Sequence, residues 1–171
     1  MTGVRFLAAA LVLLGATLLL FARLGAASLD GDEVTYALVS RGCAQQGECV
    51  PPRIFGRPFL NKPPLLFWSM AASARILGAS ELAARLPAAA SGLAVVVAVL
   101  WVGWRRFGAA TGILAAALLG TTPGLLLNHG FRAAVTDGPL SLCMLVATVT
   151  AARWRAGAAG RWPWPTAAAP S

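Results

Sequence analysis

Residues 86–106 read LPAAASGLAVVVAVLWVGWRR, and this stretch sets the class of fold. Its first 19 residues, Leu86 to Trp104, carry no charge, and the pair Arg105-Arg106 closes the run. A helix needs about 20 mainly apolar residues to cross the hydrocarbon core of a bilayer. The stretch therefore predicts a membrane-spanning helix.

The whole chain shares this apolar character. Of its 171 residues, 58% are hydrophobic and 12% are charged, whereas ordinary soluble domains carry about 25% charged residues. The apolar residues form long runs rather than one helical stripe, which is typical of segments surrounded by lipid. The formal charge of +8 does not indicate nucleic-acid binding, because the basic residues flank apolar runs singly or in pairs. We expect an all-α integral membrane protein with membrane lipid as a partner and no nucleic acid.

Three further apolar runs accompany the first. The predicted spans are residues 6–23, 84–104, 108–127 and 133–152, and they make a polytopic bundle of four transmembrane helices. The first span has an alternative reading as a secretory signal peptide, with the small residues 26–28 as its cleavage region. Residues 156–171 form a low-complexity Pro/Ala tail that does not span.

The connection between the first two spans, residues 24–83, is predicted to fold outside the hydrocarbon core. Residues 33–40 are expected to form a short helix with Val34, Ala37 and Leu38 on one face. Residues 62–78 are expected to form a helix that lies in the membrane interface. Short loops follow the positive-inside rule best, so Arg105-Arg106 place the second turn, the N-terminus and the tail in the cytoplasm. The 24–83 loop then faces outward, and every acid of the chain lies on that side.

The stretch LDGDEVTYA at residues 29–37 holds three of the six acids. The spacing of Asp30 and Glu33 fits a helix capping box, with Asp30 as the N-cap. The same carboxylates, with Asp32, also suit general-base catalysis or cation binding. The two roles are compatible, since one acid can cap the helix while another reacts.

Three other charged residues are candidates for the same outer site. Asp137 stands at the mouth of a predicted span, where an acid is costly and indicates function. The alternative is an ion pair with Arg132 that anchors the helix end. Lys62 precedes two prolines at a helix start and suits an anion such as phosphate, or else contacts lipid headgroups.

The remaining reactive side chains leave alternatives open. Cys43 and Cys49 lie in the outward loop, where a disulfide is permitted, and no second Cys or His pair accompanies them to make a zinc site. Cys143 is expected to pack in a span, and the single histidine, His129, is expected to be structural. Tyr36 suits either an interfacial aromatic belt or stacking on a sugar ring.

The order of these pieces resembles the start of the dolichyl-phosphate-mannose–protein mannosyltransferase superfamily, especially its bacterial branch with the aminoarabinose transferases of lipid A. The resemblance covers about residues 5–155, and the combined order is more specific than any single motif. The motifs that carry it are DGDEVTYA (30–37), PPRIFGRPFLNKPPLLFW (51–68), ELAARLPAA (81–89), WRRFG (104–108) and LNHGFRAAVTDGPL (127–140).

This resemblance implies a GT-C-type fold and a polyprenyl-phosphate-linked sugar donor. The sugar would pass to a lipid or protein acceptor on the periplasmic face of a bacterial inner membrane, with inversion at the anomeric carbon. The resemblance implies that Asp32 is the general base and that Arg85 is structural. Residues 1–155 would be the N-terminal part of the GT-C transmembrane domain. The implied catalytic residues are Asp32, Glu33 and Asp137, and the implied substrate-binding residues are Tyr36, Lys62 and Arg132.

The sequence departs from the family pattern in two ways. Many relatives carry Glu before the lysine, and the neutral Asn61 found here is a poorer ligand for a divalent metal cofactor than a carboxylate. The family has about a dozen spans, so the chain is expected to be a fragment that is inactive alone. A non-enzymatic four-helix membrane protein, such as a transporter or assembly subunit fragment, is the alternative.

Overall fold

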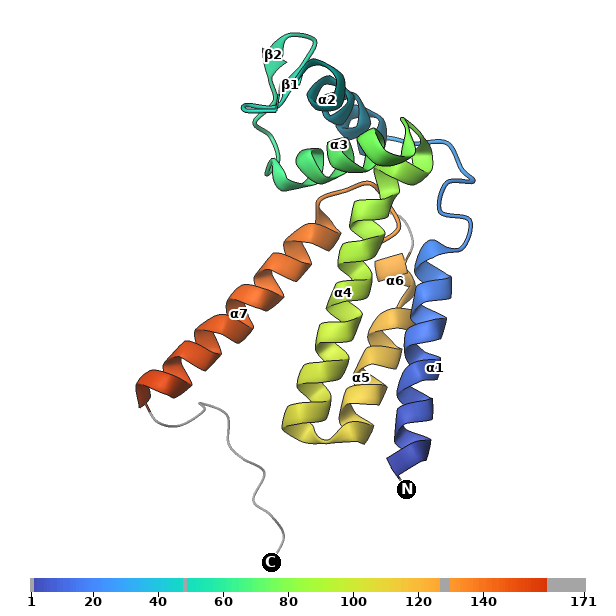
Figure 1. Cartoon of the computed structure of the whole chain (residues 1–171), viewed down its shortest axis with the longest axis vertical. Helices are drawn as coiled ribbons and strands as arrows, with labels where there is room; N and C mark the ends of the chain where they lie inside the picture. Colours follow the sequence, from blue (N-terminus) through green and yellow to red (C-terminus); the bar gives the residue numbers. More distant parts are fainter. Residues whose placement is uncertain (1, 48, 127–129, 160–171) are drawn as a thin grey trace, which may run out of the picture.

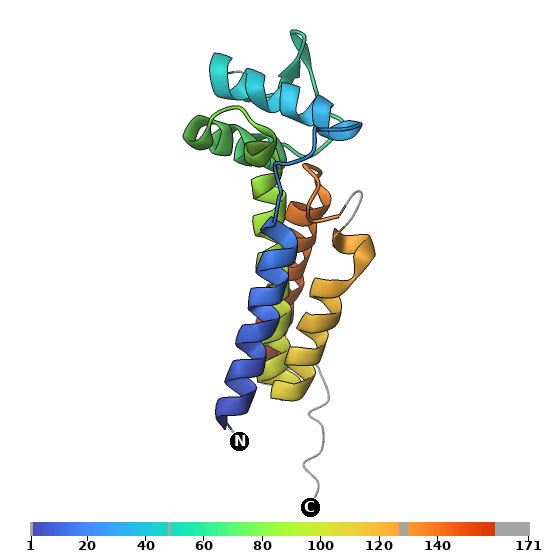
Figure 2. The same cartoon turned by 90° about the vertical axis from the view of Figure 1, so that its right-hand side faces the viewer.

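The computed structural model describes residues 2–47, 49–126 and 130–159, and Figure 1 shows their arrangement. Four helices form an elongated bundle, and a smaller unit lies across one end of it (Figures 1 and 2). We call this unit, residues 29–79, the cap. The elements are α1 (Thr2–Phe21), α2 (Asp32–Gln46), β1 (Arg53–Ile54), β2 (Arg57–Pro58), α3 (Leu65–Leu77), α4 (Glu81–Phe107), α5 (Ala109–Thr121), α6 (Pro123–Leu126) and α7 (Asp137–Ala159).

Two of the described helices are long and apolar enough to cross a membrane, Gly3–Phe21 and Glu81–Phe107. They correspond to the first two predicted spans. The third predicted span, 108–127, does not form one helix, because α5 ends at Thr121 just before Pro123. Its 13 residues extend only about 20 Å, against about 30 Å of hydrocarbon. Helix α7 has 23 residues but carries charges near both ends, so the four-span arrangement stays a prediction.

Small residues bring the bundle helices close together. A Cβ atom added to Gly112 of α5 would lie 2.5 Å from the backbone nitrogen of Trp104 in α4. A Cβ atom added to Gly103 of α4 would lie 2.7 Å from the Cα atom of Gly112. Helix α1 packs on the same pair through Ala9 and Ala16. Close approach of small residues is a usual means of helix association in lipid, where burial of apolar surface supplies little drive.

The cap consists of α2, α3 and a short hairpin. The two prediction ranges for its helices, 33–40 and 62–78, fall on α2 and α3, although α2 continues to Gln46. The apolar face expected for α2 is not its buried face, because Val34 and Leu38 are each 43% exposed. The buried face of α2 includes Tyr36 and Val39. Tyr36 and Val39 pack with Phe67 and Met70 of α3 in the cap core.

The β1–β2 hairpin is an addition to the predicted all-α fold. Arg53 pairs with Pro58 and Ile54 with Arg57, in antiparallel register. Its two turn residues, Phe55 and Gly56, both have positive φ, at 50° and 77°. A two-residue turn with this backbone matches the twist of the flanking strands, and glycine adopts it without steric cost.

Candidate functional site

A cavity of about 590 Å³ lies where the cap meets the bundle. The α1–α2 connection, the first turn of α2, α4 and the segment before α7 all contribute to it. It combines three carboxylates with three arginines. Its lining residues are Arg23, Leu24, Ala27, Asp30, Gly31, Asp32, Glu33, Arg85, Leu126, Arg132, Ala133 and Val135.

Asp32 begins α2 and presents an exposed carboxylate to this cavity. Its Oδ2 accepts a hydrogen bond from the Tyr36 hydroxyl, at 3.1 Å, one helical turn further on. The Tyr36 ring is fixed by edge contacts with Phe59 and Phe67, at centroid distances of 6.3 and 5.7 Å. A rigid, buried phenol therefore orients an accessible carboxylate.

The ionisation of Tyr36 links it to a second acid. Burial, the hydrogen bond to Asp32 and the negative charges of Asp32 and Asp137 together raise the pKa of Tyr36 to about 12. Each of these effects disfavours the phenolate. The hydroxyl therefore stays protonated and keeps donating at neutral pH. The contribution of Asp137, the first residue of α7, is the smallest of these effects.

Glu33, next to Asp32, lies in a quite different environment. Its carboxylate is buried and accepts four hydrogen bonds: from Arg85 Nε at 2.9 Å, from the second Arg85 nitrogen at 2.7 Å, from the Ala134 N–H at 2.7 Å and from the Asp30 N–H at 3.3 Å. Burial alone would raise the pKa of Glu33, but the Arg85 and backbone hydrogen bonds outweigh it, and the net pKa is lowered. Glu33 is thus held as an ion with its lone pairs engaged.

Arg85 completes this buried junction. Besides its ion pair with Glu33, its guanidinium donates to the carbonyl oxygens of Leu24 at 3.1 Å, Ala27 at 2.7 Å and Ser28 at 2.9 Å. One side chain of α4 therefore fixes the α1–α2 connection and the start of α2 together. A buried charge beside an apolar span needs a partner of opposite charge, so the sequence indicates that Arg85 is paired but does not identify which acid pairs with it.

The capping role expected for Asp30 is not formed as predicted. The N-cap of α2 is Gly31, without a side-chain capping bond, and Asp30 Oδ1 accepts instead from the Gly31 N–H at 2.7 Å. Only the reciprocal half of the capping box is present, in which Glu33 accepts from the Asp30 N–H. The box is incomplete because the positive φ of Gly31, 53°, turns the chain at this position.

Arg132 does not pair with Asp137, which was one reading of the sequence. Within the described residues, the one salt bridge is Arg85–Glu33. Arg132 instead donates to the carbonyl oxygens of Leu19 and Ala22, the latter at 2.8 Å. These carbonyls end α1 and lack helical partners, and they attract a cation. Arg132 still lines the cavity beside Asp32.

Lys62 lies apart from this group. It lines a separate cavity of about 570 Å³ with Asn61, Phe59, Trp68 and the 49–52 segment. The structure therefore brings Asp32, Glu33 and Arg132 to one cavity, with Tyr36 hydrogen-bonded to Asp32, and places Lys62 in a separate cavity. Asp137 does not line either of these cavities. His129 lies outside the described residues.

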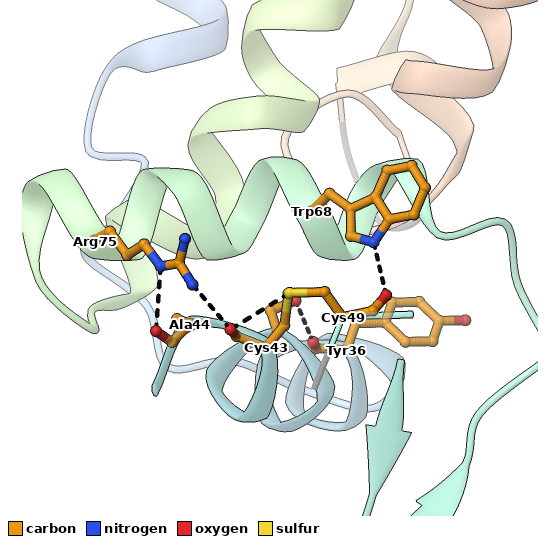
Figure 3. Close-up of a disulfide and its surroundings, with 7 residues drawn as sticks. Tyr36, Cys43, Ala44, Cys49, Trp68 and Arg75 are labelled. Atoms are coloured by element: carbon orange, nitrogen blue, oxygen red, sulfur yellow. Dashed lines mark hydrogen bonds between the residues drawn. A yellow bond between two sulfur atoms is a disulfide. The ribbon is translucent and has the colours of Figure 1, made fainter. Parts of the chain in front are cut away.

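A disulfide joins Cys43 and Cys49, with their Cα atoms 4.6 Å apart (Figure 3). Trp68 of α3 donates to the Cys49 carbonyl at 2.9 Å, and Arg75 donates to the carbonyls of Cys43 at 3.2 Å and Ala44 at 3.1 Å. Side chains of α3 therefore hold the C-terminal end of α2 and the disulfide loop in place through hydrogen bonds. Cys143 on α7 is a free thiol and is exposed rather than packed.

The donor set at the junction does not suggest a metal centre. Among the residues that the structure describes, no group of three or more His, Cys, Asp or Glu side chains is placed to hold a metal ion. The chemistry available is that of an exposed carboxylate beside guanidinium groups. Such a site can accept a proton and hold an anion.

Comparison with known proteins identifies the family. The family model described as dolichyl-phosphate-mannose-protein mannosyltransferase matches residues 61–169. No curated protein and no solved structure matches the chain. The matched segment contains Lys62, Arg85, Arg132 and Asp137, and the residues of α2 precede it. With apolar helices of spanning length and a match over more than half of its residues, the chain belongs to the dolichyl-phosphate-mannose-protein mannosyltransferase family of membrane glycosyltransferases.

Proposed function

We propose that this chain forms part of a glycosyltransferase that moves a sugar from a polyprenyl-phosphate donor to a hydroxyl of a lipid or protein acceptor. The observation that carries the proposal is the exposed carboxylate of Asp32 in one cavity with Arg132. The reaction needs a base for the acceptor and cations for the departing phosphate. Both kinds of group face the same space.

In the proposed step, Asp32 removes the proton from the acceptor hydroxyl as its oxygen attacks the anomeric carbon. The new carbon–oxygen bond forms while the bond to the lipid phosphate breaks, and polyprenyl phosphate leaves with that electron pair. Attack from the face opposite the phosphate inverts the anomeric centre. Polyprenyl phosphate is already a competent leaving group, because it departs as a phosphate monoester anion.

The other residues of the junction serve this step in different ways. Tyr36 and Glu33 position Asp32, the first by its hydrogen bond and the second by anchoring the start of α2 to Arg85. Arg132 donates two of its five N–H groups to the end of α1, so others remain for a phosphate. Asp137 adds negative charge near the Tyr36 hydroxyl and suits the acceptor side.

We place the cap on the outer, periplasmic face of a bacterial inner membrane, with the N-terminus in the cytoplasm. The Cys43–Cys49 disulfide supports this orientation, because disulfides persist in oxidising compartments. The arginine pair at the end of α4 supports it as well, since basic residues favour the cytoplasmic side.

The test compares Asp32→Asn with Glu81→Gln, a control that removes an acid outside the cavity. Each is expressed from the native chromosomal locus, and isolated membranes are supplied with polyprenyl-phosphate mannose or polyprenyl-phosphate aminoarabinose. Loss of a general base lowers rates by about 10²–10⁴-fold, so Asp32→Asn should slow donor cleavage by that factor while Glu81→Gln stays near wild type. Undiminished transfer by a well-expressed Asp32→Asn protein would remove the catalytic assignment.

The two cavities offer separate candidates for the donor phosphate. If Arg132 holds it, Arg132→Gln should raise the KM for the donor more than Lys62→Gln does. The reverse order would move the phosphate site to the cavity of Lys62.

A further inference from the structure

The end of the bundle opposite the cap contains a further charged cavity, of about 290 Å³. It lies between the last turns of α4 and the C-terminal half of α7. Figure 1 shows α7 diverging from α4 toward this end. Its lining residues are Trp101, Val102, Arg105, Arg106, Val149 and Arg153.

The charge of this cavity has one sign. All five acids that the structure describes lie at the cap end, in the 30–33 stretch or at Glu81 and Asp137. Arg105 of α4 and Arg153 of α7 therefore meet at one space from two helices, and both are exposed. A cluster of this kind attracts an anion with several acceptor oxygens, such as a phosphate diester.

Apolar side chains continue from the cavity toward the cap. On α4, Trp101 is 50% exposed and Val97 is 43% exposed, and on α7 Val146 is 56% exposed. An anion that binds here thus meets a hydrocarbon-compatible surface on the same two helices. A phospholipid has this combination of headgroup and acyl chains, whereas free phosphate does not.

We propose that this cavity is a binding site for the headgroup of an anionic phospholipid, with the acyl chains along the exposed faces of α4 and α7. Arg105 and Arg153 contact the phosphate from the two helices, and Trp101 lies at the level of the headgroup. The bound lipid fills the space where α7 leaves α4. This inference does not depend on the reaction proposed for the cap.

The test uses the purified full chain in detergent and native mass spectrometry to count bound phosphatidylglycerol and phosphatidylcholine. The unmodified chain should bind phosphatidylglycerol at least about tenfold more tightly, because each basic residue near an anionic headgroup contributes a few-fold. The pair Arg105→Gln with Arg153→Gln should lose this preference. The matched pair Arg5→Gln with Arg155→Gln changes the net charge equally outside the cavity and should keep it within about twofold.

Two further arms keep the result interpretable. The pair Arg105→Lys with Arg153→Lys retains the charge and should retain most of the preference for phosphatidylglycerol. This variant shows whether the glutamine pair loses the preference through lost charge or through misfolding. Soluble glycerol phosphate should compete poorly, because it lacks acyl chains. The proposal is overturned if the unmodified chain shows no preference for phosphatidylglycerol, if both glutamine pairs lose it equally, if the folded lysine pair loses it, or if glycerol phosphate binds as tightly as the lipid.

Discussion

The cap and the bundle use different contacts to hold their helices. In the cap, the Tyr36–Phe67 ring contact and the Arg75 hydrogen bond to the Cys43 carbonyl join α2 to α3, and Trp68 joins α3 to the disulfide loop. In the bundle, α1, α4 and α5 meet through Ala16, Val96, Ala116 and the close pair Gly103–Gly112. Close packing of small residues, as in the bundle, is a usual means of helix association in lipid, whereas apolar burial stabilises units in water.

The two regions are joined at the Arg85–Glu33 pair, and breaking it is the most damaging change that we expect. Glu33→Ala leaves a buried guanidinium without its carboxylate and should cost about 3–5 kcal/mol of stability. Thermal unfolding in detergent, together with proteolysis of the cap, measures the loss. Asp32→Ala is the matched control, because it removes a neighbouring but exposed acid, and it should cost about 1 kcal/mol or less. Equal losses in the two variants would show that the ion pair does not join the regions.

The next effect concerns the ionisation of Tyr36 in the cap. The raised pKa means that the folded state favours the protonated phenol, so its contribution to stability is complete below about pH 10 and is lost as the pH rises toward about 12. Tyr36 is the single tyrosine, so the phenolate absorbance reports it alone. We expect a midpoint about two units above the ordinary value, lowered by Asp32→Asn and lowered less by Asp137→Asn. A midpoint near 10 in a chain that keeps its helicity, or no response to Asp32→Asn, would contradict the geometry.

The smallest effect tests the packing of the bundle. Gly112→Ala puts a methyl group against the backbone of α4 and should destabilise the chain by about 1–3 kcal/mol. Gly15→Ala in α1 meets nothing within 4 Å, so it should be neutral or slightly stabilising through its better helix propensity. Thermal unfolding of the two variants gives the comparison. If Gly112→Ala is as well tolerated as Gly15→Ala, the α4–α5 contact is looser than described.

Much of the cap was predictable where local signals were strong. The helices near 33–40 and 62–78 follow from composition and from the prolines and glycine that bound the second of them. The hairpin at 53–58 was missed, because its strands have two residues each and show no periodicity. The buried face of α2 was also missed. Tyr36 and Glu33 face inward because Tyr36 packs on the Phe67 ring and Glu33 pairs with Arg85, and both partners are distant in sequence.

By itself, the sequence determined the membrane character of the chain, two spanning helices and the existence of a polar unit between them. These properties depend on hydropathy and length, which are local. Tertiary structure alone decided that Glu33 is an ion-paired anchor while Asp32 stays accessible, that Arg132 caps α1, and that Lys62 lies in another cavity. Those outcomes depend on contacts between residues 52 to 110 positions apart, such as Arg85 with Glu33 and Arg132 with Ala22, and no local pattern encodes them.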